Sequence, residues 1–171
     1  HAVYLSGGQD SEQTQRDWTI EGNRVELSPG SGAFLNIRGG PHGAHRGIIR
    51  YNEIVGAGRW GIVQNDVRPT GQASSIRVYG NRFRARFNQA VIQFADYNTP
   101  DHLNGVDSTF VVEHNWLENL DPDGYVLWRY PDIIAPHEPH RPTLRGNVYR
   151  SPSGRFAGNI DPGPQARLLS P

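Results

Sequence analysis

The feature that most constrains this chain is an internal repeat anchored on asparagine. Five short segments align on one Asn without gaps: WTIEGNRV (18–25), GIIRYNEI (47–54), IRVYGNRF (76–83), FVVEHNWL (110–117) and PTLRGNVY (142–149). The anchors lie 29, 29, 34 and 32 residues apart, at Asn23, Asn52, Asn81, Asn115 and Asn147. A repeat of this length indicates a fold built by stacking one structural unit on the next.

Two apolar columns accompany the anchors in all five units. Three residues before the anchors stand Ile20, Ile49, Val78, Val112 and Leu144, and two residues after them stand Val25, Ile54, Phe83, Leu117 and Tyr149. Each unit predicts a strand, a tight Asn turn, a strand, a Gly-containing turn, a third strand and a loop of variable length. One unit cannot bury its own apolar column, so parallel stacking of the units is expected to form the core.

The repeated asparagine suits a tight turn. Asn tolerates the left-handed backbone region, and its amide can bond backbone groups. When the units stack at the strand spacing of about 4.8 Å, the same amides can also bond one another. We therefore expect an amide ladder along the stack.

This pattern resembles the right-handed parallel β-helix of pectate-lyase-like proteins and of carbohydrate-binding and sugar-hydrolase repeat domains. The resemblance implies an all-β solenoid of about five to six rungs over residues 1–160. The Pro-rich tail at 161–171 is expected to cap one end of the stack, with Leu168 and Leu169 in the core. Since open terminal rungs need a cover, we expect another chain or a segment preceding His1 to cover the first rung.

Composition excludes several chemistries. The chain has no Cys, and all 17 of its basic residues are Arg, so disulfides, thiol nucleophiles and Schiff-base lysines are excluded. A formal net charge of zero argues against nucleic acid as a partner. No apolar run approaches the roughly 18 residues that span a membrane, so no membrane partner is expected either. The family resemblance implies an extracellular or cell-surface location.

In that family, polysaccharide binds on the outer face of the first sheet, which the resemblance places at 32–37, 61–66, 90–95 and 124–129. We assign the inward column of this sheet to Val3, Phe34, Val63, Ile92, Val126 and Phe156. Strand alternation then places an outer strip of Gln64, Asp66, Gln93, Tyr125 and Arg129 against the substrate. Trp60, in the neighbouring turn, is a candidate stacking platform for a sugar ring.

The long loops at 96–109 and 130–141 hold the candidates for acid–base chemistry. In a lyase, His102 or Arg141 is the candidate base, and Arg129 the cation that neutralises a uronate carboxylate. A glycosidase needs two carboxylates, for which the candidates are Asp66, Asp101, Asp107 and Asp121. His137 and His140 are assigned to substrate binding.

These residues leave the activity open. The His-x-x-His pairs lie among Pro and Gly, so no metal site is predicted and no cofactor is expected. Calcium, held by Asp101, Asp107, Asp121 and Asp123, is the chemical alternative. The chain has no Lys, and the pectin-cleaving motifs of the family are absent apart from Asn65-Asp66. The sequence thus predicts a polysaccharide-binding or polysaccharide-cleaving protein, a lyase or a hydrolase. A non-catalytic segment of a phage tail, adhesin or cell-surface protein is the alternative.

Overall fold

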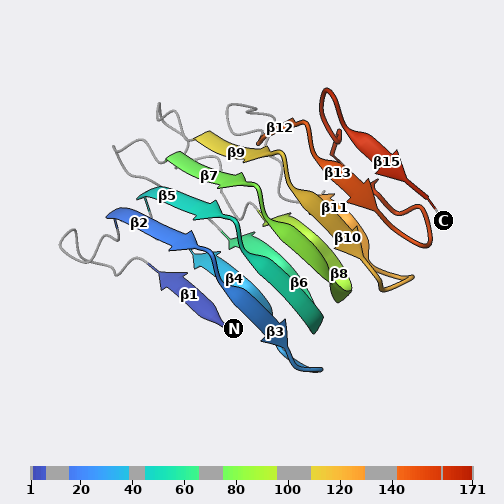
Figure 1. The fold of residues 1–171 in the computed structure, drawn as a ribbon, viewed down its shortest axis with the longest axis horizontal. Coiled ribbons are helices and arrows are strands. Elements are labelled where there is room, and N and C mark those ends of the chain that lie inside the picture. The colour runs from blue at the N-terminus through green and yellow to red at the C-terminus, as the bar shows by residue number, and fades with distance from the viewer. Residues whose placement is uncertain are drawn as a thin grey trace.

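Every regular element in the described part of the chain is a β-strand (Figure 1). The computed structural model describes residues 2–6, 16–38, 45–65, 75–95, 109–129, 142–158 and 160–170. The predicted all-β class is therefore confirmed. Among these residues there is no helix long and apolar enough to cross a membrane.

The described strands form two sheets, each built of parallel strands. The small sheet contains β2 (Arg16–Glu21), β5 (His45–Arg50), β7 (Ser75–Tyr79), β9 (Thr109–Glu113) and β12 (Thr143–Arg145). The first half of the ten-stranded large sheet contains β3 (Arg24–Leu27), β10 (Trp116–Asn119), β13 (Val148–Arg150), β15 (Arg167–Leu169) and the starts of β6 (Glu53–Asn65) and β8 (Arg82–Ala95). Its second half contains β1 (Val3–Ser6), β4 (Ala33–Arg38), β11 (Tyr125–Arg129), β14 (Ala157–Gly158) and the ends of β6 and β8. This arrangement is compatible with a β-helix or another solenoid-like fold.

The predicted repeat sets the register of both sheets. In the small sheet, Ile20, Ile49, Val78, Val112 and Leu144 pair in sequence. In the large sheet, Val25, Ile54, Phe83, Leu117 and Tyr149 do the same. Both predicted apolar columns are thus confirmed, because each unit lays equivalent residues beside those of the previous one.

The second and third strands of a unit are less separate than the sequence predicts. In two units they join into the single long strands β6 and β8, with a register irregularity between Gly58 and Trp60. The expected Gly-containing turn is there a bend within one strand. As a result, the three predicted strand columns form two sheets.

The Asn turns form the predicted ladder. The side-chain Nδ2 of each Asn donates to Oδ1 of the next, at 2.9 Å from Asn23 to Asn52, from Asn52 to Asn81 and from Asn81 to Asn115, and at 3.0 Å from Asn115 to Asn147. The backbone N–H of each of the first four also donates to the next Oδ1, at 3.0 Å.

The left-handed residue of the turn was predicted at the wrong position. Positive φ occurs one residue before each Asn, at Gly22, Tyr51, Gly80, His114 and Gly146. The asparagine contributes its amide to the ladder, and its neighbour supplies the change of chain direction.

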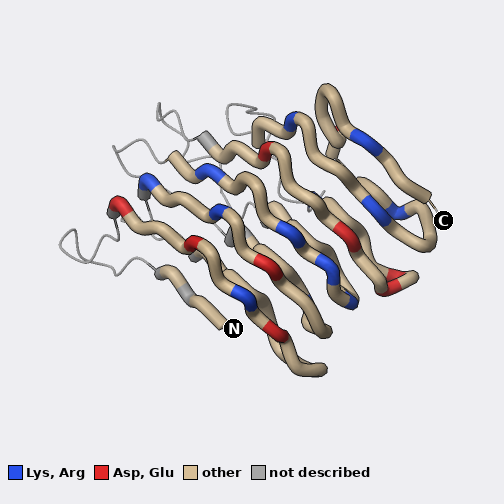
Figure 2. Tube along the Cα trace, in the orientation of Figure 1, with Lys and Arg blue, Asp and Glu red and all other residues tan. Residues whose placement is uncertain are grey.

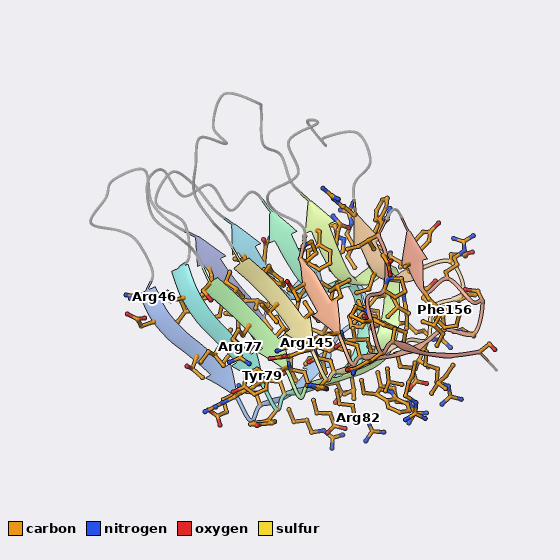
Figure 3. All side chains as sticks on the ribbon, turned by 90° about the horizontal axis from the view of Figure 1, so that it is seen from above. Arg46, Arg77, Tyr79, Arg82, Arg145 and Phe156 are labelled. Atoms are coloured by element: carbon orange, nitrogen blue, oxygen red, sulfur yellow. The ribbon has the colours of Figure 1, made fainter. Side chains whose placement is uncertain are left out.

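The core lies between the two sheets (Figure 3). The ring of Phe34 packs edge-on against Phe83 at a centroid distance of 6.1 Å, and Phe94 packs against Phe110 of the small sheet at 5.5 Å. These rings connect the halves of the large sheet to each other and to the small sheet.

The inward column predicted for the second half of the large sheet is wrong in register. Val3, Leu35, Ile62, Ile92 and Leu127 pair in sequence, followed by Ala157. The predicted position was therefore one residue too early at Phe34, Val126 and Phe156, and one residue too late at Val63. The predicted strands have two consecutive apolar residues at this point, and both are buried. The apolar pattern therefore could not distinguish between the two possible registers.

The two ends of the stack differ. At the first rung, Ile20 and Val25 are partly exposed, whereas their column neighbours Ile49 and Ile54 are fully buried. The cover expected over the first rung stays a prediction. At the other end, the tail adds the parallel strand β15 beside β13. Leu168 is 49% exposed, so it does not fill the core as predicted.

Candidate functional site

The second half of the large sheet presents an outer face on which aromatic side chains gather. Phe94 faces the space between the sheets, since it packs against Phe110. Its neighbour Gln93 points to the opposite side, because successive side chains of a strand alternate. Val63 and Trp128 are in register with Gln93 on the two adjacent strands, so they belong to the same outer column.

Trp60 and Gln93 are fixed to each other on this face. The indole N–H of Trp60 donates to Oε1 of Gln93 on the next rung. Gln93 is 2% exposed. The guanidinium of Arg59 stacks over the indole, 4.2 Å from the ring centroid. The amide of Gln93 therefore holds the indole in place, and Arg59 covers one ring face.

A second aromatic pair lies one rung further along. Tyr125 and Trp128 stack with centroids 6.0 Å apart and an interplanar angle of 17°. The guanidinium of Arg155 lies 5.5 Å from the Tyr125 ring centroid, and its Nη1 donates to the carbonyl of Asp123 at 2.7 Å. A Cβ at Gly158 would lie 2.9 Å from Trp128 and 3.0 Å from Tyr125, so glycine leaves room for the two rings.

We call this group the aromatic platform: Arg59, Trp60, Gln93, Tyr125, Trp128 and Arg155. Its rings come from β6 and β11, and its glutamine comes from β8, which pairs with both of these strands. Aromatic faces stack on apolar ring surfaces, and guanidinium groups donate hydrogen bonds to hydroxyl and carboxylate oxygens. The arrangement can bind a sugar chain by stacking, with polar contacts at the rim.

The structure brings together three of the predicted substrate-binding residues, Trp60, Gln93 and Tyr125. Gln64 lies in β6, in register with Phe94 rather than with Gln93, so the two glutamines belong to different columns. The remaining site predictions lie outside the described residues: Asp66, Asp101, His102, Asp107, His137, His140 and Arg141.

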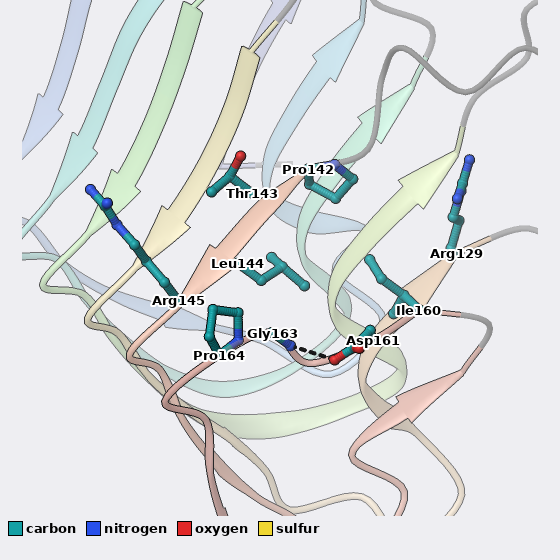
Figure 4. Close-up of a pocket in the computed structure, with 9 residues that line it drawn as sticks. All are labelled: Arg129, Pro142, Thr143, Leu144, Arg145, Ile160, Asp161, Gly163 and Pro164. Carbon is teal, nitrogen blue, oxygen red and sulfur yellow. Dashed lines mark hydrogen bonds between the residues drawn. The ribbon is translucent and has the colours of Figure 1, made fainter.

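Arg129 lies apart from the platform. It is in register with Phe94, on the face opposite to Gln93. There it lines a pocket of about 500 Å3 at the last rung, with Leu144 of the small sheet and Ile160 and Pro164 of the tail (Figure 4). The register does not support a role for Arg129 beside Gln93, because alternation places the two side chains on opposite sides of the sheet.

The acidic residues of the 121–124 turn serve the turn itself. Oδ1 of Asp121 accepts a hydrogen bond from the backbone N–H of Asp123 at 2.9 Å. Within the described ranges, no group of three or more His, Asp or Glu side chains is placed to hold a metal ion. The calcium alternative therefore gains no support from Asp121 and Asp123.

Sequence reasoning missed two buried glutamates that organise arginines. Glu113 and Glu118 have side chains that are 4% and 5% exposed. Glu113 binds Arg77 and, at 2.6 Å, Nε of Arg145. The hydrogen bond from Arg77 lowers the pKa of Glu113, against the effect of burial, and Arg145 lowers it further.

Glu118 has the equivalent arrangement on the large sheet. Its carboxylate lies 3.5 Å from Nε of Arg84 and 3.4 Å from Nη1 of Arg150, and it accepts a 3.2 Å hydrogen bond from the indole N–H of Trp116. The repeat alignment held the signal for both groups. Two residues before the anchor stand Glu21, Arg50, Tyr79, Glu113 and Arg145, and three residues after it stand Glu26, Val55, Arg84, Glu118 and Arg150. Opposite charges therefore occupy adjacent rungs at Glu113 and Arg145 and on both sides of Glu118.

Neither protein-family models, nor curated proteins, nor solved structures match this chain. The class of protein is therefore argued from the fold and from the platform.

Proposed function

We propose that this chain is a right-handed parallel β-helix that binds a polysaccharide on the aromatic platform. The observation that carries the proposal is a set of side-chain contacts on the outer face. The indole of Trp60 donates to Gln93, and Tyr125 stacks on Trp128, which pairs with Gln93. At a strand spacing of about 4.8 Å, the platform extends about 10 Å along the stack. That length favours a ligand of more than one sugar ring.

The chemistry of the platform suits a sugar chain. The apolar faces of pyranose rings stack on Trp and Tyr, and Arg59 and Arg155 stand beside the rings with donors for hydroxyl or carboxylate oxygens. Because Gln93 is bonded to Trp60, it acts as a positioning residue for the indole. Prior fixation of the indole reduces the entropy lost on binding.

The residues of the aromatic platform support binding of a polysaccharide. Cleavage would also require an acid and a base. A lyase or hydrolase would take its acid and base from the loops, with Asp101, His102, Asp107 and Arg141 as candidates. Arg129 is a poor partner for them at the platform, because it lies on the inner face. We therefore propose a binding surface, on a protein that is extracellular or exposed on a cell surface.

The second candidate function is a non-catalytic structural segment. The observation in its favour is the partial exposure of Ile20 and Val25, which belong to columns buried in the next rung. Another chain or a further segment stacked there would bury them. In that case the platform would be an ordinary outer surface, and no polysaccharide would bind to it.

The test compares three alanine variants for retention on defined neutral and acidic polysaccharides. Trp60→Ala and Tyr125→Ala are expected to weaken binding about tenfold each, equivalent to about 1.4 kcal/mol. Tyr51→Ala is the matched control, since this tyrosine is 58% exposed on the small-sheet side of the Asn turns. Unsaturated products would reveal a lyase and released reducing ends a hydrolase. Absence of binding by the unaltered protein would favour the structural segment.

A further inference from the structure

The outer face of the first half of the large sheet carries an excess of positive charge. On β8, Arg82, Arg84 and Arg86 are exposed, while Phe83 and Ala85 between them are buried. Figure 2 shows these arginines together with basic positions on β13 and β15. This region lies in the part of the sheet that adjoins the Asn turns, and the aromatic platform lies in the other half.

The charge of this arginine face can be counted from its outward residues. Its arginines are Arg24, Arg82, Arg84, Arg86, Arg150 and Arg167, and its acids are Glu26, Glu53 and Glu118. Six positive and three negative charges leave +3 on this face, whereas the whole chain has a formal net charge of zero. The positive charge is therefore a local property of this face.

Buried Glu118 arranges part of the face for an anion. It holds Arg84 and Arg150 from the two flanking strands, and their side chains remain 54% and 48% exposed. A guanidinium has five N–H donors, and a single carboxylate does not use all of those on two arginines. Arg82 and Arg86 add two guanidiniums for which no ion pair occurs within the described residues. The arginine face thus presents oriented guanidinium N–H donors, whose positive charge is only partly balanced by carboxylates.

We propose that the arginine face is a second binding surface, which takes the carboxylate or sulfate groups of an acidic polysaccharide. An Arg fork binds either oxyanion through paired hydrogen bonds. The face spans six strands of the stack, so a chain fits it better than a single small anion. A charge of +3 over that length suits a polymer of low charge density better than duplex DNA, which has one negative charge per about 1.7 Å.

The test measures retention on immobilised chondroitin sulfate, polygalacturonate and duplex DNA across a salt gradient. Arg82→Gln with Arg86→Gln removes two cations without leaving a buried carboxylate unpaired, and should weaken polysaccharide binding about tenfold or more. Arg84→Lys with Arg150→Lys keeps the charge but loses the planar forks, and should weaken binding by at least about threefold. Thermal unfolding of each variant checks that it remains folded.

Arg46→Gln is the matched control, because Arg46 is an exposed arginine of the small sheet that forms a salt bridge to Asp17. It should bind like the unaltered protein. Retention on the sulfated or on the carboxylated polymer supports the proposal and identifies the anion. No retention on either, equal retention on DNA, an equal loss in Arg46→Gln or full retention by the lysine variant would each overturn it. The variant with Arg82→Gln and Arg86→Gln should keep its retention on neutral polysaccharides, which separates this surface from the aromatic platform.

Discussion

At the scale of single residues, the repeated asparagine does more than close a turn. In the middle of the ladder, Oδ1 of Asn81 accepts from both the backbone N–H and the side chain of Asn52. Its Nδ2 donates to the carbonyl of Ile49 and to Oδ1 of Asn115, both at 2.9 Å. Each Asn therefore satisfies buried polar groups of the rungs on either side as well as its own turn.

Asn81→Ala is accordingly expected to lower the free energy of unfolding by about 2–4 kcal/mol, because the backbone N–H of Asn52 loses its side-chain acceptor and the oxygens of Ile49 and Asn115 each lose a buried donor. Asn23→Ala is the matched control. Asn23 is exposed at the start of the ladder, and its replacement should cost less than about 1 kcal/mol. Urea unfolding of both variants measures the difference, and equal costs would mean that the ladder adds little beyond the turn.

The asparagine ladder could be predicted from sequence, but the left-handed residue beside it could not. Gly, Tyr and His all occupy that position, so composition gives no common signal. The structure supplies the reason for part of the variation. A Cβ at Gly80 would lie 2.7 Å from the ring of Tyr51, and one at Gly146 would lie 2.7 Å from that of His114. A bulky residue in one turn therefore covers a glycine in the next, which is a contact between rungs.

At the scale of strands, repeated apolar positions predicted the register beside the Asn turns and failed beyond the next bend. Near the anchor, Ile54 follows a polar residue and Phe83 lies between two arginines, which favours the register that buries this column. After the bend, consecutive apolar residues such as Ile62 and Val63 are both buried, and the irregularity before Trp60 shifts the count. The platform was therefore predicted in part. Trp60, Gln93 and Tyr125 were recognised, but Trp128 was missed, and the contacts among these residues depended on a register that the pattern left open.

Buried carboxylates also connect neighbouring strands, and the stability that Glu113 contributes should depend on pH. Hydrogen bonds from Arg77 and Arg145 lower the pKa of Glu113 in the folded protein below the value of about 4.3 expected when unfolded. A lowered folded-state pKa means that this stabilisation is complete above the unfolded value and is lost as the pH falls through the folded one. The protein should therefore lose stability below about pH 4.3, partly through Glu113.

Glu113→Gln should make this acid loss shallower, because the amide has no proton to gain. Urea unfolding at several values between about pH 6 and 3 measures the slope. Glu26→Gln provides the control, since Glu26 is exposed on β3 and has no ion pair within the described residues. An equal slope for Glu113→Gln and the unaltered protein would show that other carboxylates account for the acid sensitivity.

At the scale of the whole molecule, the stack is close to one-dimensional. Each strand pairs with equivalent strands of the neighbouring units, so the stability of a rung depends on its two neighbours. Apolar residues that are buried in the middle rungs are partly exposed at the first rung. Ile49 is fully buried, whereas its column neighbour Ile20 is partly exposed. We expect the ends to open more readily than the middle, although the same residue types form both.

Native-state hydrogen exchange of two matched variants tests this gradient. Ile49 is fully buried, so Ile49→Ala should lower the free energy of unfolding by about 2–5 kcal/mol. It should also reduce amide protection in β5 and in the adjoining strands β2 and β7. Ile20→Ala should cost less and reduce protection mainly in β2, because that strand has a neighbour on one side only. Equal loss of protection throughout both sheets in the two variants would contradict the gradient, since it would mean that the stack unfolds only as a whole.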